Sequence, residues 1–254
     1  MPTLPSTPEL SVVVLCYRSG ERVRGFAREI SEVLTRAGIE SYELVLVANY
    51  LDPRPGEPED PTPALVRELA RNDPRLVAST LKKQGMMGWD LRSGLALASG
   101  RSLAMLDGDG QVRAGDLATT FAVLRAGGVD LVKATRVERD DGVARRALSF
   151  LYNLLFRLLF PGLPVSDING KPKILTRAAY ERLDLRSDDW FVDAEMMIQA
   201  RRLGFVVREV ETVFLDLQAR RSFVRWNAIW EFLGNLARAW RQEQRWEWGG
   251  EAER

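Results

Sequence analysis

Through the first half of the chain, short apolar runs alternate with longer segments in which apolar residues recur at helical spacing. The runs predict strands and the longer segments predict amphipathic helices, because side chains alternate across a strand but repeat every three to four residues along a helix. We expect strands at residues 11–16, 42–47, 76–80, 102–106 and 130–134. We expect helices between them at residues 23–34, 64–70, 86–98 and 115–125. Such alternation is typical of an α/β protein with a mostly parallel sheet and helices on both faces.

The second half of the chain departs from this simple alternation. We expect an apolar helix at residues 147–160, an extended segment at 171–175, a helix at 191–202 and a strand at 205–210. After Ser222, apolar residues recur at helical spacing and predict an amphipathic C-terminal helix. These apolar positions are Trp226, Ile229, Trp230, Leu233, Leu236, Ala237 and Trp240. We therefore expect one α/β domain over residues 1–221, followed by a helix and tail over 222–254.

Composition excludes several kinds of partner and site. The 36 Lys and Arg residues nearly balance the 35 Asp and Glu residues, so no net field favours nucleic acid as a partner. Cys16 is the single cysteine and lies in an apolar run, so we expect a core residue and neither a disulfide nor a thiolate zinc site. The N-terminus lacks a basic segment followed by an apolar one, so we expect no secretory leader and a cytoplasmic protein.

The most informative segment directly follows the buried strand expected at 102–106. It reads Asp-Gly-Asp-Gly-Gln, and two carboxylates two residues apart at a strand's end can face one small volume that needs a cation. Gly108 and Gly110 leave room for a large anion, and Gln111 offers a neutral oxygen. The chain has no histidine, so a metal site here uses oxygen ligands, which favours Mg²⁺ or Mn²⁺. The alternative is an ordinary solvated turn, since Asp and Gly are common turn residues.

Several further motifs occur in a fixed order over residues 10–222. Together they resemble the family 2 glycosyltransferases with the GT-A fold, and within them the dolichyl-phosphate mannose synthase-like polyprenyl-phosphate sugar transferases. The matching segments are residues 11–18, 42–47, 85–94, 107–111, 135–136, 167–173, 191–195 and 201–204. Two segments depart from the family pattern. Arg18-Ser19 stands where the family has Asn-Glu, and residues 48–51 read Ala-Asn-Tyr-Leu where it has Asp-Asp-Gly-Ser, which leaves the nucleotide base open.

The resemblance implies a metal-dependent, inverting transfer of a sugar from a nucleotide-diphosphate donor. It implies that the metal ligands are Asp107, Asp109 and Gln111. It implies that the nucleotide sugar contacts Tyr17, Asn49, Gly85, Asp107, Lys173 and Arg221. It implies that an acceptor phosphate contacts Arg136, Arg145 and Ser149. The residues that we assign to catalysis are Asp109, Asp193 and Glu195.

Three kinds of acceptor or role remain open. A polyprenyl phosphate is already an anion and needs orientation rather than deprotonation, so it requires no general base. A saccharide or small-molecule hydroxyl instead needs a carboxylate to take its proton, for which Asp193 and Glu195 are the candidates. The third interpretation is a degenerate module that binds nucleotide sugars or proteins without turnover. The intact acidic motif favours the enzyme.

Two apolar segments raise the question of a membrane. Residues 145–160 combine Arg145, Arg146 and Arg157 with many Leu and Phe residues, which is typical of a helix lying on a lipid surface. The tail adds tryptophans, which favour membrane and protein interfaces alike, at positions 226, 230, 240, 246 and 248. We therefore expect peripheral attachment to a membrane, with a core or dimer helix as the alternative. A separate membrane protein or a second copy of the chain are further partners to consider.

Overall fold

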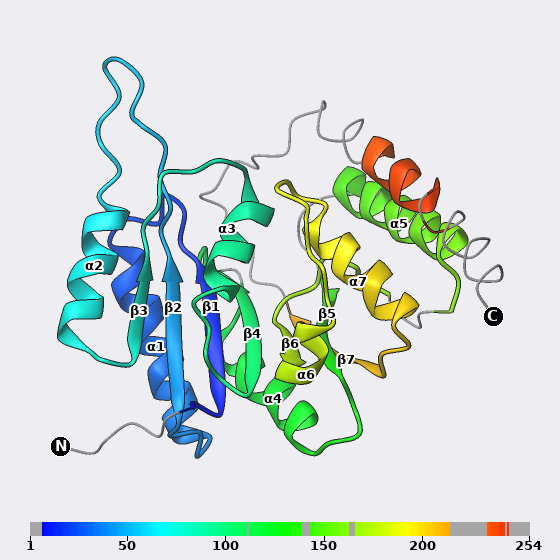
Figure 1. The fold of residues 1–254 in the computed structure, drawn as a ribbon, viewed down its shortest axis with the longest axis horizontal. Helices are drawn as coiled ribbons and strands as arrows, with labels where there is room; N and C mark the ends of the chain where they lie inside the picture. Colours follow the sequence, from blue (N-terminus) through cyan, green and yellow to red (C-terminus); the bar gives the residue numbers. More distant parts are fainter. Residues whose placement is uncertain are drawn as a thin grey trace.

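The computed structural model describes residues 7–110, 112–138, 143–162, 166–213, 233–241 and 243. In this part of the chain, seven strands form one mixed sheet in the order β3-β2-β1-β4-β6-β5-β7 (Figure 1). The strands are β1 (Leu10–Leu15), β2 (Tyr42–Val47), β3 (Leu76–Ser79), β4 (Ser102–Asp107), β5 (Leu131–Glu138), β6 (Lys173–Thr176) and β7 (Val207–Val213). The α/β class and the mostly parallel sheet that the alternation predicts are confirmed.

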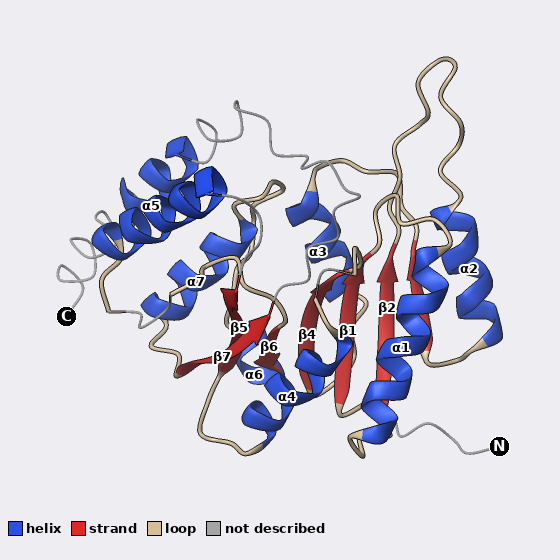
Figure 2. Cartoon of the chain, turned by 180° about the vertical axis from the view of Figure 1, so that it is seen from behind, coloured by secondary structure: helices blue, strands red, loops and turns tan. Residues whose placement is uncertain are grey.

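Helices cover both faces of this sheet (Figure 2). They are α1 (Arg22–Arg36), α2 (Thr62–Asn72), α3 (Met87–Leu95), α4 (Ala114–Arg125), α5 (Val143–Leu159), α6 (Arg177–Glu181) and α7 (Val192–Arg202). The apolar residues of α1, α2 and α4 join one core cluster, whereas those of α3, α5, α6 and α7 join another. The sheet therefore separates two cores, and β1 is apolar except at Ser11 because its residues contribute to both cores.

The centre of the sheet contains a change of direction in the order of its strands. β1 and β4 are parallel neighbours. From β1 the chain continues to β2 and β3 on one side, and from β4 it continues to strands on the other side. Crevices at such a switch point, beyond the carboxyl ends of the strands, are the usual ligand sites of open α/β sheets. The loops after β1 and β4 therefore border the expected site.

β6 runs antiparallel between β4 and β5, a position that local periodicity does not predict. Its first paired residue is Lys173, two residues later than the start of the expected extended segment. Pro172 precedes it and has no N–H to donate to a ladder, which explains the later start. The pairing Met105↔Lys173 sets the register between β4 and β6. Lys171 lies two residues before β6, and its side chain contacts Asp107 at the end of β4.

The C-terminal helix is described over residues 233–241, where it lies beside α5 (Figure 1). Leu236 is buried in the same core cluster as Phe156 of α5 and Phe160, the residue that follows α5. Arg201 of α7 also forms an ion pair of 3.0 Å with Glu243. This part of the predicted amphipathic helix therefore packs on the α/β domain. No helix in the described ranges has the length and apolarity needed to cross a bilayer.

Candidate active site

The acidic loop after β4 lies at the switch point and is tied to the loop after β1. Asp107 pairs with Leu15 at the ends of the two strands. The N–H of Gly108 then donates to the carbonyl oxygen of Leu15 at 2.9 Å, and the Ser19 hydroxyl donates to the carbonyl oxygen of Gly108 at 3.2 Å. A Cβ at position 108 would lie 2.7 Å from the Leu15 oxygen, so glycine is required for this approach. The predicted position of the loop is correct.

The two carboxylates of this loop suit an oxygen-ligated cation. The side chain of Asp107 is 38% exposed, and Asp109 is half-buried, so both border solvent rather than the core. Among the described residues, no three or more His, Cys, Asp or Glu side chains lie close enough together to hold a metal ion by themselves. A cation here would therefore complete its shell with water and with oxygens of a bound anion, which is how Mg²⁺ is commonly held. Gln111, the predicted third ligand, lies outside the described residues.

Lys171 contacts this loop from the buried side and was not among the predicted site residues. Its Nζ lies 2.8 Å from Oδ1 of Asp107 and 3.5 Å from Oδ2 of Asp193, and its side chain is only 4% exposed. Burial alone would lower the pKa of this ammonium, but the charges of Asp107 and Asp193 outweigh burial and hold the pKa above its ordinary value. Lys171 is therefore cationic at neutral pH.

Asp193 and Lys173, predicted as a general base and a nucleotide contact, form a buried ion pair with each other. Asp193 is 3% exposed, Lys173 is fully buried, and the Lys173 ammonium donates to Oδ1 of Asp193. Burial would raise the pKa of Asp193, but Lys171 and Lys173 outweigh it and lower the pKa. A buried carboxylate held by two ammonium groups does not reach an acceptor hydroxyl. In this structure the two residues support the site from within the core, and their assignments as base and nucleotide contact stay predictions.

Glu195, the other predicted catalytic acid, holds a loop. Its Oε1 accepts the N–H of Arg186 at 2.9 Å, and its Oε2 accepts the N–H of Ser187 at 2.9 Å. Asp188 follows in this loop. Its backbone carbonyl oxygen accepts hydrogen bonds from the N–H groups of Met86 and Trp89 at the start of α3. Both oxygens of Glu195 are therefore used within the protein in this structure, and its assignment as a proton acceptor stays a prediction.

Asn49, predicted to contact the base, is buried and fully engaged. Its Nδ2 donates to Asp90 at 3.0 Å and Ser93 at 2.8 Å, while its Oδ1 accepts from Ser79 at 3.0 Å and the Leu81 N–H at 2.8 Å. An amide that uses both ends in this way has no edge left for a base. It instead fixes the carboxyl ends of β2 and β3 against α3, which corrects the predicted direct contact.

Tyr17, the predicted nucleotide contact after β1, lies next to Lys83, which pairs with the same Asp90 that Asn49 contacts. Lys83 lies over its ring, 4.3 Å from the ring centroid, and also donates to Asp90. A cation over an aromatic face is attracted by the ring's charge distribution. The half-buried Tyr17 thus forms, with Lys83, a wall at the carboxyl ends of β1 and β3. Nothing in this geometry opposes its predicted role.

Gly85, also predicted near the nucleotide, is packed at the start of α3. A Cβ there would lie 2.6 Å from Cβ of Trp89 and 2.9 Å from Cβ of Asp188. Glycine is therefore needed for the close contact between this turn and the 186–190 loop. Its role in ligand binding stays a prediction.

The predicted acceptor-phosphate residues have mixed outcomes. Arg136 forms two hydrogen bonds to Asp167, from Nε at 2.6 Å and from Nη2 at 2.8 Å, and its side chain is 14% exposed. Arg136 is thus held by a bidentate pair in this structure, and its contact with an acceptor phosphate stays a prediction. Arg145 and Ser149 belong to α5, in the part whose side chains are not described, and Arg221 lies outside the described residues.

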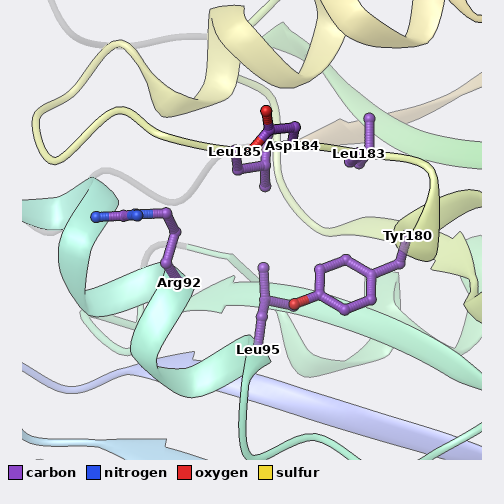
Figure 3. A pocket seen from close by; sticks show the side chains of 6 residues that line it. All are labelled: Arg92, Leu95, Tyr180, Leu183, Asp184 and Leu185. Atoms are coloured by element: carbon purple, nitrogen blue, oxygen red, sulfur yellow. The ribbon is translucent and has the colours of Figure 1, made fainter.

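A cavity next to α3 is distinct from these residues. It has a volume of about 210 Å³ and is lined by Arg92, Leu95, Tyr180, Leu183, Asp184 and Leu185 (Figure 3). None of these is a predicted site residue. Ligand pockets for small molecules usually measure about 300–1,000 Å³, so this cavity is too small for a nucleotide sugar.

Comparisons with known proteins agree with this arrangement. The family model for glycosyl transferase family 2 matches residues 11–184. Glycosyltransferase AglD of Haloferax volcanii is 27% identical over 208 residues, which cover 79% of this chain and 32% of AglD. The chain therefore spans about a third of the length of that curated relative, whose other regions have no counterpart in the match.

Solved structures share the fold. Glucosyl-3-phosphoglycerate synthase from Mycobacterium tuberculosis, in complex with Mn²⁺, uridine diphosphate and phosphoglyceric acid, matches with a TM-score of 0.67 and 17% identity over 91% of this chain and 77% of its own. Mannosyltransferase PcManGT from Pyrobaculum calidifontis, in complex with GDP-Man and Mn²⁺, matches with a TM-score of 0.55 and 20% identity over 88% of this chain and 61% of its own.

The fold is thus the GT-A fold, with the acidic loop at its switch point. The chain belongs to glycosyl transferase family 2, because the family model covers more than half of it. The family that the order of motifs indicates is confirmed.

If Asp193 supports the fold rather than the chemistry, Asp193→Asn will be strongly destabilising. The substitution leaves two buried ammonium groups with too few counter-charges, and breaking a buried ion pair costs about 3–5 kcal/mol. Urea unfolding followed by circular dichroism measures the effect. The control is Asp52→Asn, which removes an exposed partner of Lys82 and should cost less than about 1 kcal/mol. Equal unfolding free energies for the two variants would contradict the structural role.

Proposed function

We propose that this glycosyltransferase moves a sugar from a nucleotide-diphosphate sugar to the phosphate of a polyprenyl lipid, with inversion at the anomeric carbon. The observation that carries the donor half of the proposal is the solvent-facing pair Asp107 and Asp109 at the switch point of the sheet. Two structural neighbours are complexes with Mn²⁺ together with a nucleotide diphosphate or nucleotide sugar, which supports a divalent cation here. Either Mg²⁺ or Mn²⁺ fits carboxylate ligands.

The protein's own residues prepare this site for an anionic donor. When bound, the cation would neutralise the charge that develops on the leaving diphosphate. Asp107 and Asp109 would hold it, and Gln111 stays a predicted third ligand. Tyr17 and Lys83 form a wall beside the acidic loop that suits the nucleoside end of the donor. The Gly108 contact with β1 brings these two parts of the site together.

The state of the two candidate bases favours a phosphate acceptor over a hydroxyl. A hydroxyl acceptor needs a carboxylate to take its proton, but Asp193 is buried between lysines and Glu195 accepts two backbone N–H groups. A lipid phosphate is ionised before it attacks the anomeric carbon and needs only orientation. The competing acceptor is a saccharide or small-molecule hydroxyl, and the degenerate binding module remains the non-catalytic alternative.

The outer face of α5 supports attachment to a lipid surface. Phe156 and Phe160 are buried in the core, but Leu151 and Leu158, seven residues apart, are 60% and 71% exposed. Such spacing places both leucines on one face of the helix, next to the exposed Arg157. An apolar face beside basic residues suits the interface of an anionic membrane, where the lipid acceptor would lie.

The donor and acceptor halves can be tested in one assay. We expect the protein to convert a labelled nucleotide sugar and polyprenyl phosphate, with Mg²⁺ or Mn²⁺, into an organic-extractable product of inverted configuration. Asp107→Asn and Asp109→Asn should each lower the rate about a hundredfold or more, the usual effect of removing one charge-stabilising group. Asp52→Asn, at the exposed pair with Lys82, is the matched control and should retain activity.

The acceptor panel adds the matching polyprenol without its phosphate, simple saccharides and phosphoglyceric acid. Transfer to a saccharide or to phosphoglyceric acid but not to the lipid phosphate would contradict the acceptor. Retention of the donor's anomeric configuration would contradict the single displacement. Absence of turnover with every donor and acceptor would favour the binding module.

Vesicle flotation tests the membrane contact. We expect the wild-type protein to float with phosphatidylcholine vesicles that contain phosphatidylglycerol. The double variant Leu151→Ser, Leu158→Ser should bind at least about tenfold more weakly, because burying one leucine contributes about 1.5–3 kcal/mol. Leu97→Ser removes an exposed leucine that lies just after α3 and is the control. Wild-type protein that stays in the soluble fraction with these vesicles would exclude the attachment.

A further inference from the structure

The ion pair between Asp107 and Lys171 places a fixed positive charge where a metal ion would bind. Nζ of Lys171 lies 2.8 Å from Oδ1 of Asp107, so in this conformation the lysine occupies one oxygen of the carboxylate. The two partners differ in exposure: the Asp107 side chain is 38% exposed to solvent, whereas that of Lys171 is 4% exposed. A cation that arrives from solvent therefore meets Asp107 with the ammonium already behind it.

Lys171 is held in this position by groups deeper in the core. Oδ2 of Asp193 lies 3.5 Å from its Nζ, and Sδ of Met87 lies 3.6 Å away. Asp193 is itself fixed by Lys173, which is fully buried. The four side chains form a line from the open site into the core: Asp107, Lys171, Asp193 and Lys173. Because of this anchoring, the ammonium does not move into bulk solvent when another cation approaches.

Two cations that share one carboxylate repel each other, and burial reduces the screening of that repulsion by water and salt. A divalent ion on its own would therefore bind Asp107 and Asp109 less tightly than an isolated acidic pair would bind it. A diphosphate changes this balance because its oxygens carry negative charge that can face both the metal ion and the ammonium. The positive charge of Lys171 would therefore weaken binding of the metal ion alone, but it would strengthen binding of the metal ion together with the diphosphate.

We propose that Lys171 is a positioning residue that makes divalent-metal binding at Asp107 and Asp109 depend on the nucleotide diphosphate. In the free enzyme it serves as the counter-ion of Asp107. In the loaded enzyme it keeps its place and faces the diphosphate from the buried side. The proposal rests on the proposed function, because it takes the two aspartates as ligands of the cation. By linkage, the nucleotide diphosphate then gains affinity from the metal by the same factor.

Direct binding of Mn²⁺ to the full chain tests this role without an activity assay. The electron paramagnetic resonance signal of free Mn²⁺ gives the affinity in the absence of nucleotide. Lys171→Met removes the charge but keeps the apolar stem, and should bind Mn²⁺ at least about tenfold more tightly than wild type, within the usual range of coupling between two sites. Lys82→Met removes an exposed lysine paired with Asp52 and should leave the affinity unchanged.

Calorimetric titration with uridine diphosphate and guanosine diphosphate, with and without Mn²⁺, measures the coupling itself. We expect Mn²⁺ to strengthen nucleotide binding to the wild type, and to strengthen it at least about tenfold less in Lys171→Met. Lys171→Gln, which is neutral but can still donate to Asp107, should behave like Lys171→Met and serves as the second variant if the methionine form does not fold. Circular dichroism establishes which variants are folded.

The outcomes separate the inference from the proposed function. A folded Lys171→Met or Lys171→Gln variant with wild-type Mn²⁺ affinity and wild-type coupling would overturn the role of Lys171 and leave the metal site intact. Wild-type protein that binds no Mn²⁺ with either nucleotide, or binds it equally well after Asp107→Asn, would overturn the metal site itself and with it this inference.

Discussion

The site depends on a cross-strand ion pair where two antiparallel strands end. Lys171 lies just before β6 and contacts Asp107 at the end of β4, and Asp193, which is itself paired with Lys173, contacts the lysine from the buried side. An aspartate at the open end of a strand would otherwise be free to turn away from its neighbour. Here its Oδ1 is held by an ammonium, while its side chain stays 38% exposed to solvent. The remaining features of the site are arranged around this fixed carboxylate.

The sheet topology explains why the crevice lies at this point. β1 and β4 are parallel neighbours from which the chain continues in opposite directions, so their loops do not cover each other. Gly108 brings the acidic loop within hydrogen-bonding distance of β1. Asn49 and Asp90 secure the adjacent ends of β2 and α3. Several polar side chains near the acidic loop therefore act as supports in this structure, and Lys83, which pairs with Asp90, lies over the ring of Tyr17.

The sequence predicts the parts of this arrangement that depend on neighbouring residues. The periods of two and of three to four residues locate the strands and most helices, and the Asp-Gly-Asp segment follows directly from where a buried strand stops. Cys16 is buried in the core as expected, and burial raises the pKa of its thiol to about 12. Within the described residues, the structure contains one helix that we did not expect from the sequence, the short helix α6.

The sequence does not predict the partners of side chains that pair with residues distant in the sequence. Asn49 is engaged by Asp90, Arg136 by Asp167, and Asp193 by two lysines that precede it by about twenty residues. Each residue type suited the assigned chemistry, but pairing is decided by strand order and register, which a single sequence does not display. The same reason explains why Lys171 was not predicted: its importance appears only when β6 is placed antiparallel to β4.

The central claim is that Asp107 and Asp109 hold a divalent cation against a diphosphate. It is tested most directly by anomalous X-ray diffraction from crystals grown with Mn²⁺ and a nucleotide diphosphate, recorded on both sides of the manganese absorption edge. The account predicts an anomalous peak within bonding distance of at least one of these two carboxylates and of the diphosphate oxygens. A bound diphosphate with no manganese peak beside either aspartate would contradict it.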